Sequence, residues 1–193
     1  MIKRPFFAHF KAGPESQRGW VALGADYWYD TLVILTSEHT APDYPAARDI
    51  RQAWTRLKAM TPQRPPWPQV WAEWKAHVVQ QASGQPVGLT LTALSPGPTP
   101  QLWMAAYNSV PGVRWRDNDM WVPSATDGMQ ITSQAGDLWI WGTPNLWNAT
   151  QQPELVNIIQ TSSSTDDIAV RLVESANEAH AHAFGAVIAF VEE

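Results

Sequence analysis

The period of the hydrophobic pattern changes repeatedly along this chain, and the order of these changes restricts the folds that it can adopt. Short apolar runs at residues 19–24 and 31–36 have the length of strands, and the second run is rich in β-branched residues. From residue 46 to residue 82, apolar side chains instead recur every three or four positions. The proline-rich segment 61–68 interrupts this pattern. The first part of the chain therefore predicts two strands followed by a pair of helices.

A block of strand-like runs occupies the middle of the chain, from residue 87 to residue 141, and turn-forming residues divide it into hairpins. Helical spacing returns at about 153–180, and a last strand-like run lies at 186–191. Helix pairs around a strand block are typical of an α+β layered fold rather than a doubly wound parallel sheet. No segment resembles a long linker, so we expect a single domain over residues 1–193.

The charge, the cysteine content and the hydropathy exclude several classes of protein. Thirteen Lys and Arg against 18 Asp and Glu give a net charge of −5, which argues against a nucleic-acid-binding protein. The absence of cysteine excludes disulfides, thiolate metal sites and cysteine nucleophiles. No apolar run has the length of a membrane span or of a signal peptide, so we expect a cytoplasmic protein that does not bind membranes.

Tryptophan is unusually frequent, with 12 residues in a chain of 193. Aromatic rings could stack on a carbohydrate or a nucleobase. However, Trp67, Trp71 and Trp74 have helical spacing, while Trp139 and Trp141 lie on one face of a predicted strand. These spacings favour a role in the core over a role in ligand binding.

Few residues have the spacing of a catalytic or metal-binding motif. The glycines form neither a dinucleotide-binding nor a phosphate-loop motif, and no serine-nucleophile motif occurs. His180 and His182 could place two imidazoles on one side of an extended segment, but no third ligand has motif spacing to them. We therefore interpret this pair as a polar turn. Asp26 lies between two apolar runs, where a carboxylate is less expected.

One segment resembles a known family. Residues 136–148 read Gly-Asp-Leu-Trp-Ile-Trp-Gly-Thr-Pro-Asn-Leu-Trp-Asn and precede two predicted helices and a final strand. This stretch resembles the metal-dependent protein phosphatases of the PPM family (type 2C). In that family, Gly-Asp, an apolar strand and Ser-Asp-Gly-Leu-Trp-Asp precede helices and a closing strand with an Asp-Asn pair.

The resemblance extends over nearly the whole chain from about Gly19. Residues 32–47 correspond to an apolar strand, the family's Asp-Gly-Met-Gly-Gly-His motif and the start of a helix. Residues 88–93, Gly-Leu-Thr-Leu-Thr-Ala, are similar to the family's Gly-Thr-Thr strand. Residues 102–110 are similar to the strand that leads into Gly-Asp-Ser-Arg. The implied fold is a four-layer α-β-β-α sandwich of two antiparallel sheets flanked by helix pairs at about 46–82 and 153–180.

The same resemblance implies that the metal-binding residues are replaced. Family members hold two Mg²⁺ or Mn²⁺ ions with aspartates, and a bridging water attacks the phosphoester. The corresponding positions here are Asp26, Thr36, Ser37, Pro144, Asn145, Ala183 and Phe184. Only the first of these carries a carboxylate, and one carboxylate does not hold two divalent cations. No residue is therefore assigned as catalytic, metal-binding or cofactor-binding, and no cofactor is expected.

These residues favour a pseudophosphatase, a non-catalytic PPM-like domain that binds another protein in Ser/Thr phosphosignalling. A kinase, a phosphatase or a phosphoprotein is the expected partner. One alternative is an active metal-dependent phosphatase with repositioned ligands, for instance Asp26, Glu38, His39 and Asp43. A second alternative is a small-ligand-binding module that uses the emptied, tryptophan-lined cleft between the sheets. We also expect Trp71, Trp74, Ile158 and Leu172 to be buried.

Overall fold

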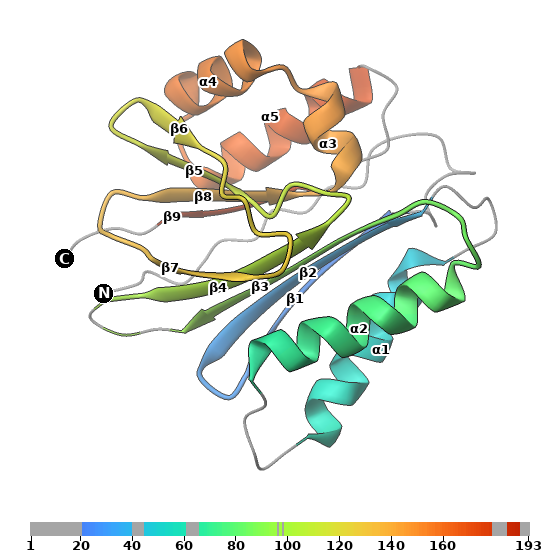
Figure 1. The fold of residues 1–193 in the computed structure, drawn as a ribbon. Helices are drawn as coiled ribbons and strands as arrows, with labels where there is room; N and C mark the ends of the chain where they lie inside the picture. The colour runs from blue at the N-terminus through green and yellow to red at the C-terminus, as the bar shows by residue number, and fades with distance from the viewer. Residues whose placement is uncertain are drawn as a thin grey trace.

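A computed structural model describes residues 21–39, 45–60, 66–95, 97, 99–178 and the backbone of 185–189. Along the chain, strands and helices alternate in blocks, as the hydrophobic periodicity predicts (Figure 1). The elements are β1 Val21–Trp28, β2 Thr31–His39, α1 Ala46–Ala59, α2 Trp67–Gln81, β3 Val87–Ser95, β4 Gln101–Tyr107, β5 Val113–Arg116, β6 Asp119–Trp121, β7 Met129–Thr132, β8 Leu138–Gly142, α3 Pro144–Ala149, α4 Gln152–Thr161, α5 Thr165–Glu178 and β9 Gly185–Ala189.

The strands form two antiparallel sheets that pack against each other. The first sheet has the strand order β1-β2-β3-β4-β7, and the second has the order β6-β5-β8-β9. Helices α1 and α2 cover the outer face of the first sheet, while α3, α4 and α5 cover the outer face of the second (Figure 1). The structure therefore confirms the predicted α+β sandwich of four layers.

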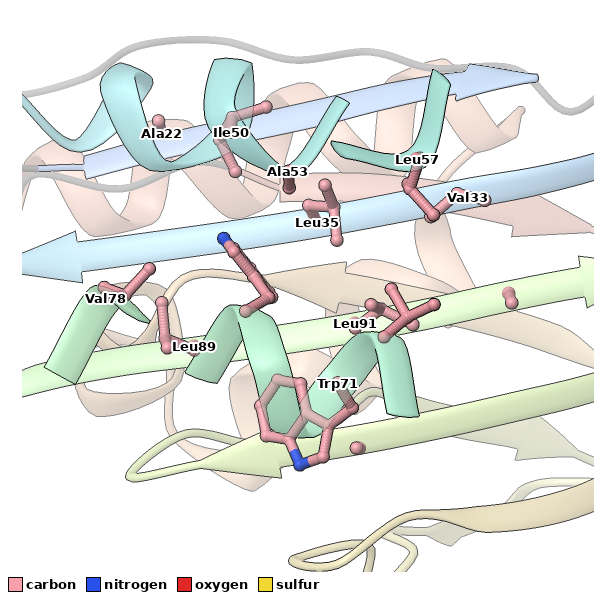
Figure 2. Close-up of a cluster of buried hydrophobic side chains, with 14 of the residues drawn as sticks. Ala22, Val33, Leu35, Ile50, Ala53, Leu57, Trp71, Val78, Leu89 and Leu91 are labelled. Atoms are coloured by element: carbon pink, nitrogen blue, oxygen red, sulfur yellow. The ribbon is translucent and has the colours of Figure 1, made fainter. Parts of the chain in front are cut away.

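Strand β2 is buried on both faces because it lies between a helix layer and the second sheet. Val33 and Leu35 pack beneath Ile50 and Leu57 of α1 (Figure 2). The alternate residues of β2, among them Ile34, face the space between the two sheets. A strand enclosed in this way needs apolar side chains on both faces, which explains the continuous apolar run in the sequence.

The space between the sheets is filled by large side chains. The indole rings of Trp139 and Trp141 stack with their centroids 5.9 Å apart, and both side chains are fully buried. Their N–H groups donate hydrogen bonds to Ser133 Oγ at 3.0 Å and Thr92 Oγ1 at 2.9 Å, so both of these indole N–H groups are paired. Both tryptophans are core residues, as their spacing on one face of the strand predicts.

The four side chains expected to be buried are buried. Trp71 and Trp74 pack against the first sheet, and Ile158 and Leu172 pack against the second. Helix α5 begins with a side-chain cap, in which the Asp167 N–H donates to Ser164 Oγ at 3.1 Å. No helix in the described ranges has both the length and the apolar character of a membrane span.

Two local predictions differ from the structure. Strand β1 continues to Trp28, so Asp26 lies inside a strand and not between two strands. The chain reverses at Tyr29, whose φ of 55° is left-handed, and not at the earlier Gly24. Helix α3 is a further element that the pattern does not indicate. Its proline, Pro144, stands in the first turn, where a missing N–H costs no hydrogen bond.

Candidate functional site

One edge of the sandwich brings several of the positions singled out in the sequence together. Strand β2 ends there beside the start of β3, and the end of β8 leads into α3. The backbone N–H of Asn145 donates a hydrogen bond to Glu38 Oε2 at 3.0 Å. A Cβ atom placed on Gly88, the β3 partner of Glu38, would lie 2.6 Å from Pro144 Cγ. The segment that follows β8 of the second sheet therefore packs directly on the end of β2 and the start of β3 in the first sheet.

Thr36 lies on β2 two positions before Glu38 and is paired with a second threonine. Its Oγ1 lies 2.7 Å from Oγ1 of Thr90, its direct neighbour on β3, and both side chains are buried. Each hydroxyl can donate or accept, so one of the two donates to the other. The pair is neutral and holds β2 and β3 in register through their side chains as well as their backbones.

Glu38 is the carboxylate nearest to this pair along β2. Burial raises the pKa of Glu38 from 4.5 to about 7, although hydrogen bonds from the Asn145 backbone and the Thr143 side chain oppose the shift. A carboxyl group with such a pKa is partly protonated at neutral pH. Its contacts join β2 of the first sheet to the β8–α3 corner of the second.

Glu38→Gln is expected to flatten the dependence of stability on pH. A carboxyl whose pKa is raised on folding stabilises the native state below the unfolded pKa, and this contribution is lost as the pH rises through about 7. The wild-type free energy of unfolding should therefore fall by on the order of 2 kcal/mol more than that of Glu38→Gln between pH 5 and pH 8. Urea unfolding at several pH values measures this difference.

Glu73→Gln is a suitable control, because Glu73 is exposed on α2. Its pH profile should follow that of the wild type. Equal profiles for the wild type and Glu38→Gln would show that the Glu38 carboxyl is not buried as described.

A second polar cluster lies on the opposite face of β2. Ser37 Oγ donates to Asp49 Oδ2 at 2.5 Å, and His39 Nε2 lies 2.6 Å from the same oxygen. The Trp74 indole donates to the backbone carbonyl of Asp49 at 3.2 Å. The three side chains of Ser37, His39 and Asp49 are buried between the sheet and α1. Serine and histidine both bind the carboxylate and are not paired with each other, so this arrangement is not that of a serine nucleophile with its base.

Asp26 is remote from the threonine pair. It pairs with Val33 across the β1–β2 hairpin, whereas the residue opposite Thr36 is Leu23. The Asp26 carboxylate is half exposed and faces the helix layer, where its Oδ2 lies 4.0 Å from Nζ of Lys58. Residues directly opposite in a hairpin share a face, so Asp26 shares the outer face with Val33, and Thr36 lies on the inner face. Asp26 therefore lies on the opposite face of the first sheet from Thr36.

The set of repositioned ligands does not converge either. Glu38 faces the second sheet, while Asp26 and His39 face the helix layer. Asp43, Ala183 and Phe184 lie outside the described residues, as do His180 and His182.

Comparisons by sequence and by structure give different results for this chain. No family model matches this chain, and no curated protein matches it. Solved structures do match. The Ser/Thr phosphatase PstP/Ppp of Mycobacterium tuberculosis superposes with a TM-score of 0.70 at 12% identity, over 97% of this chain and 99% of that one. The PPM Ser-Thr phosphatase MsPP of Mycobacterium smegmatis gives 0.68 at 17% identity, over 96% and 98%. The Ser/Thr phosphatase of S. agalactiae gives 0.72 at 9% identity, over 97% and 100%.

This chain has the fold of the PPM-type Ser/Thr phosphatases. The match covers nearly the full length of both chains, so the two sheets and both helix layers are shared. Identities below one in five explain why the sequence finds no family model.

The donor atoms at the described part of this edge do not fit a centre of two divalent ions. The PstP catalytic domain was solved with two manganese ions. Hard divalent cations take several oxygen ligands each, mostly carboxylates and waters. Here the side chains are threonines, one proline, one asparagine and the single carboxylate of Glu38. Within the described ranges, no three His, Cys, Asp or Glu side chains lie close enough to hold a metal ion.

Two residues with buried contacts, Asp49 and Thr143, were not singled out from the sequence. Asp49 has a detectable signal, because it lies on the apolar stripe of α1 with Ala53 and Leu57, at intervals of four. A charged residue on such a stripe needs a buried partner. Thr143 carries no comparable signal, because its contact with Glu38 depends on how the two sheets approach each other.

Proposed function

We propose that this protein is a pseudophosphatase, a non-catalytic domain of the PPM fold that acts by binding another protein in Ser/Thr phosphosignalling. The observation that carries the proposal is the edge of the sandwich at Thr36. By the sequence resemblance, Thr36 corresponds to the aspartate of the family's Asp-Gly-Met-Gly motif. Its side chain forms a buried hydrogen bond with Thr90. Function follows the site and not the fold, so the loss of these carboxylates argues against hydrolysis.

Direct protein contacts here stabilise an edge where clustered aspartates would repel each other without cations. Glu38 binds the first turn of α3 through the Asn145 N–H, and Pro144 packs on Gly88. These contacts join the two sheets directly. The fold can thus persist after the loss of catalysis, and its surface remains available for binding. A kinase, a phosphatase or a phosphoprotein is the partner class that we propose.

The small-ligand alternative has less support. It requires tryptophans that line a cleft between the sheets. Trp139 and Trp141 instead stack on each other and hydrogen-bond within the core. Their rings are therefore not available for stacking on a ligand.

Phosphatase assays test the proposal directly. We expect no hydrolysis of a phosphoserine peptide or of p-nitrophenyl phosphate above buffer with Mn²⁺ or Mg²⁺. Pro144→Asp should not restore turnover, since one added carboxylate does not complete a centre that needs several oxygen ligands. Metal-dependent turnover that Glu38→Gln abolishes would refute the proposal.

A further inference from the structure

An open groove lined by three arginines lies between α1 and α2, on the outer face of the first sheet. Its volume is about 390 Å³. The groove is built from the exposed sides of two helices that pack next to each other (Figure 1). The lining side chains are Arg48, Arg51, Gln52, Thr55, Arg56 and His77.

The positive charge of this groove is not balanced locally. Three of the 13 Lys and Arg residues of a chain with a net charge of −5 line this one groove. Among the described residues, no carboxylate forms an ion pair with Arg48, Arg51 or Arg56. The nearest buried acid, Asp49, binds Ser37 and His39 instead. The Arg56 guanidinium donates to the backbone carbonyl of Glu73, at 3.5 Å.

His77 adds a neutral polar group to the floor of the groove. Its Nε2 lies 2.7 Å from Oε1 of Gln52, so it donates to that carbonyl oxygen. Burial and the nearby Arg56 lower the pKa of His77. A bound anion would oppose the effect of Arg56 and raise this pKa again, which makes His77 a reporter of occupancy.

We propose that this groove binds a phosphorylated side chain of a partner protein. Guanidinium groups donate paired hydrogen bonds in a fork that matches phosphate oxygens, and a phosphoserine carries close to two negative charges. Two guanidinium groups can therefore bind one phosphate, while Gln52 and Thr55 supply further polar contacts. The groove is larger than a phosphate group and open along its length, so flanking peptide residues fit beside it. The identity of the occupant as a protein rests on the proposed function.

Peptide binding tests the assignment. The probe is a labelled degenerate nonapeptide mixture with a central phosphoserine, measured by fluorescence anisotropy against the same mixture with serine. We expect the phosphorylated mixture to bind at least about tenfold more tightly. The double variant Arg48→Gln/Arg51→Gln should remove this preference. Both arginines are exposed, so the variant is expected to keep its fold.

A control variant and a second measurement distinguish binding in the groove from a general effect of charge. Lys58→Gln removes a charge from the same helix outside the groove and should leave the phosphopeptide preference unchanged. In the wild type, the phosphopeptide should also raise the pKa of His77 measured by NMR, and inorganic phosphate should compete only weakly. Phosphate that binds as tightly as the peptide would assign the groove to a free anion and overturn the proposal.

Three other outcomes would also overturn the proposal that this groove binds a phosphorylated side chain. Equal binding of serine and phosphoserine peptides would exclude phosphate recognition, and an unchanged preference in the arginine variant would place recognition elsewhere. Tighter binding of a single-stranded DNA of equal charge would assign the groove to nucleic acid. None of these results depends on turnover, so this proposal and the pseudophosphatase proposal can fail separately.

Discussion

Asp49→Ala is expected to lower the free energy of unfolding by about 3–5 kcal/mol, because breaking a buried polar pair leaves its partners without compensation. Ser37 and His39 both bind the Asp49 carboxylate and are themselves buried. Removal of the carboxylate leaves a hydroxyl and an imidazole nitrogen away from water. Urea unfolding followed by tryptophan fluorescence measures the loss.

Asp166→Ala provides the matched control, because Asp166 is an exposed acid in the first turn of α5. Its removal should cost no more than about 1 kcal/mol, the scale of a charge near a helix terminus. Asp49→Asn should be less harmful than Asp49→Ala, since its side-chain oxygen can still accept one hydrogen bond. A loss below about 1 kcal/mol for Asp49→Ala would contradict the buried cluster.

Trp141→Ala is expected to destabilise the protein by about 3–5 kcal/mol through the cavity that it leaves between the sheets. The Trp141 side chain is 1% exposed, stacks on Trp139 and donates to Thr92. Its ring also lies against Gly112, where a Cβ atom would approach Trp141 Nε1 to 3.0 Å. Loss of the Trp141 ring therefore removes both the packing between the sheets and the hydrogen bond to Thr92.

Trp141→Phe separates these two effects, because phenylalanine keeps an aromatic ring but has no N–H group. The unpaired Thr92 hydroxyl and the smaller ring should cost less than the alanine substitution, on the order of 2 kcal/mol. Thermal unfolding by differential scanning calorimetry gives both values. Equal losses for the two variants would mean that the ring does not fill the core between the sheets.

The order of elements could be predicted from the sequence, because each layer has its own hydrophobic period. The helical stripe that contains Trp71 and Trp74, and the doubly buried run of β2, follow from local spacing. Helix α3 could not be predicted, since Pro144 can end a helix as readily as begin one.

The candidate site could be predicted only in part. Pro144 and Asn145 pack beside Gly88 and Glu38, because strand order fixes where strand ends meet. Asp26 lies on the outer face and Thr36 on the inner face, because the register of the β1–β2 hairpin sets which residues share a face. The pKa of Glu38 depends on burial by a segment more than 100 residues away in the chain, at Asn145, which no local pattern reports.

In the proposed pseudophosphatase, protein contacts take the place of a metal centre. Calorimetric titration with Mn²⁺ tests this claim most directly. We predict no saturable heat of binding and no change in the melting temperature at millimolar Mn²⁺, because a cation stabilises a protein only when it binds the native state preferentially. Saturable Mn²⁺ binding that raises the melting temperature and is lost in Glu38→Gln would contradict the account.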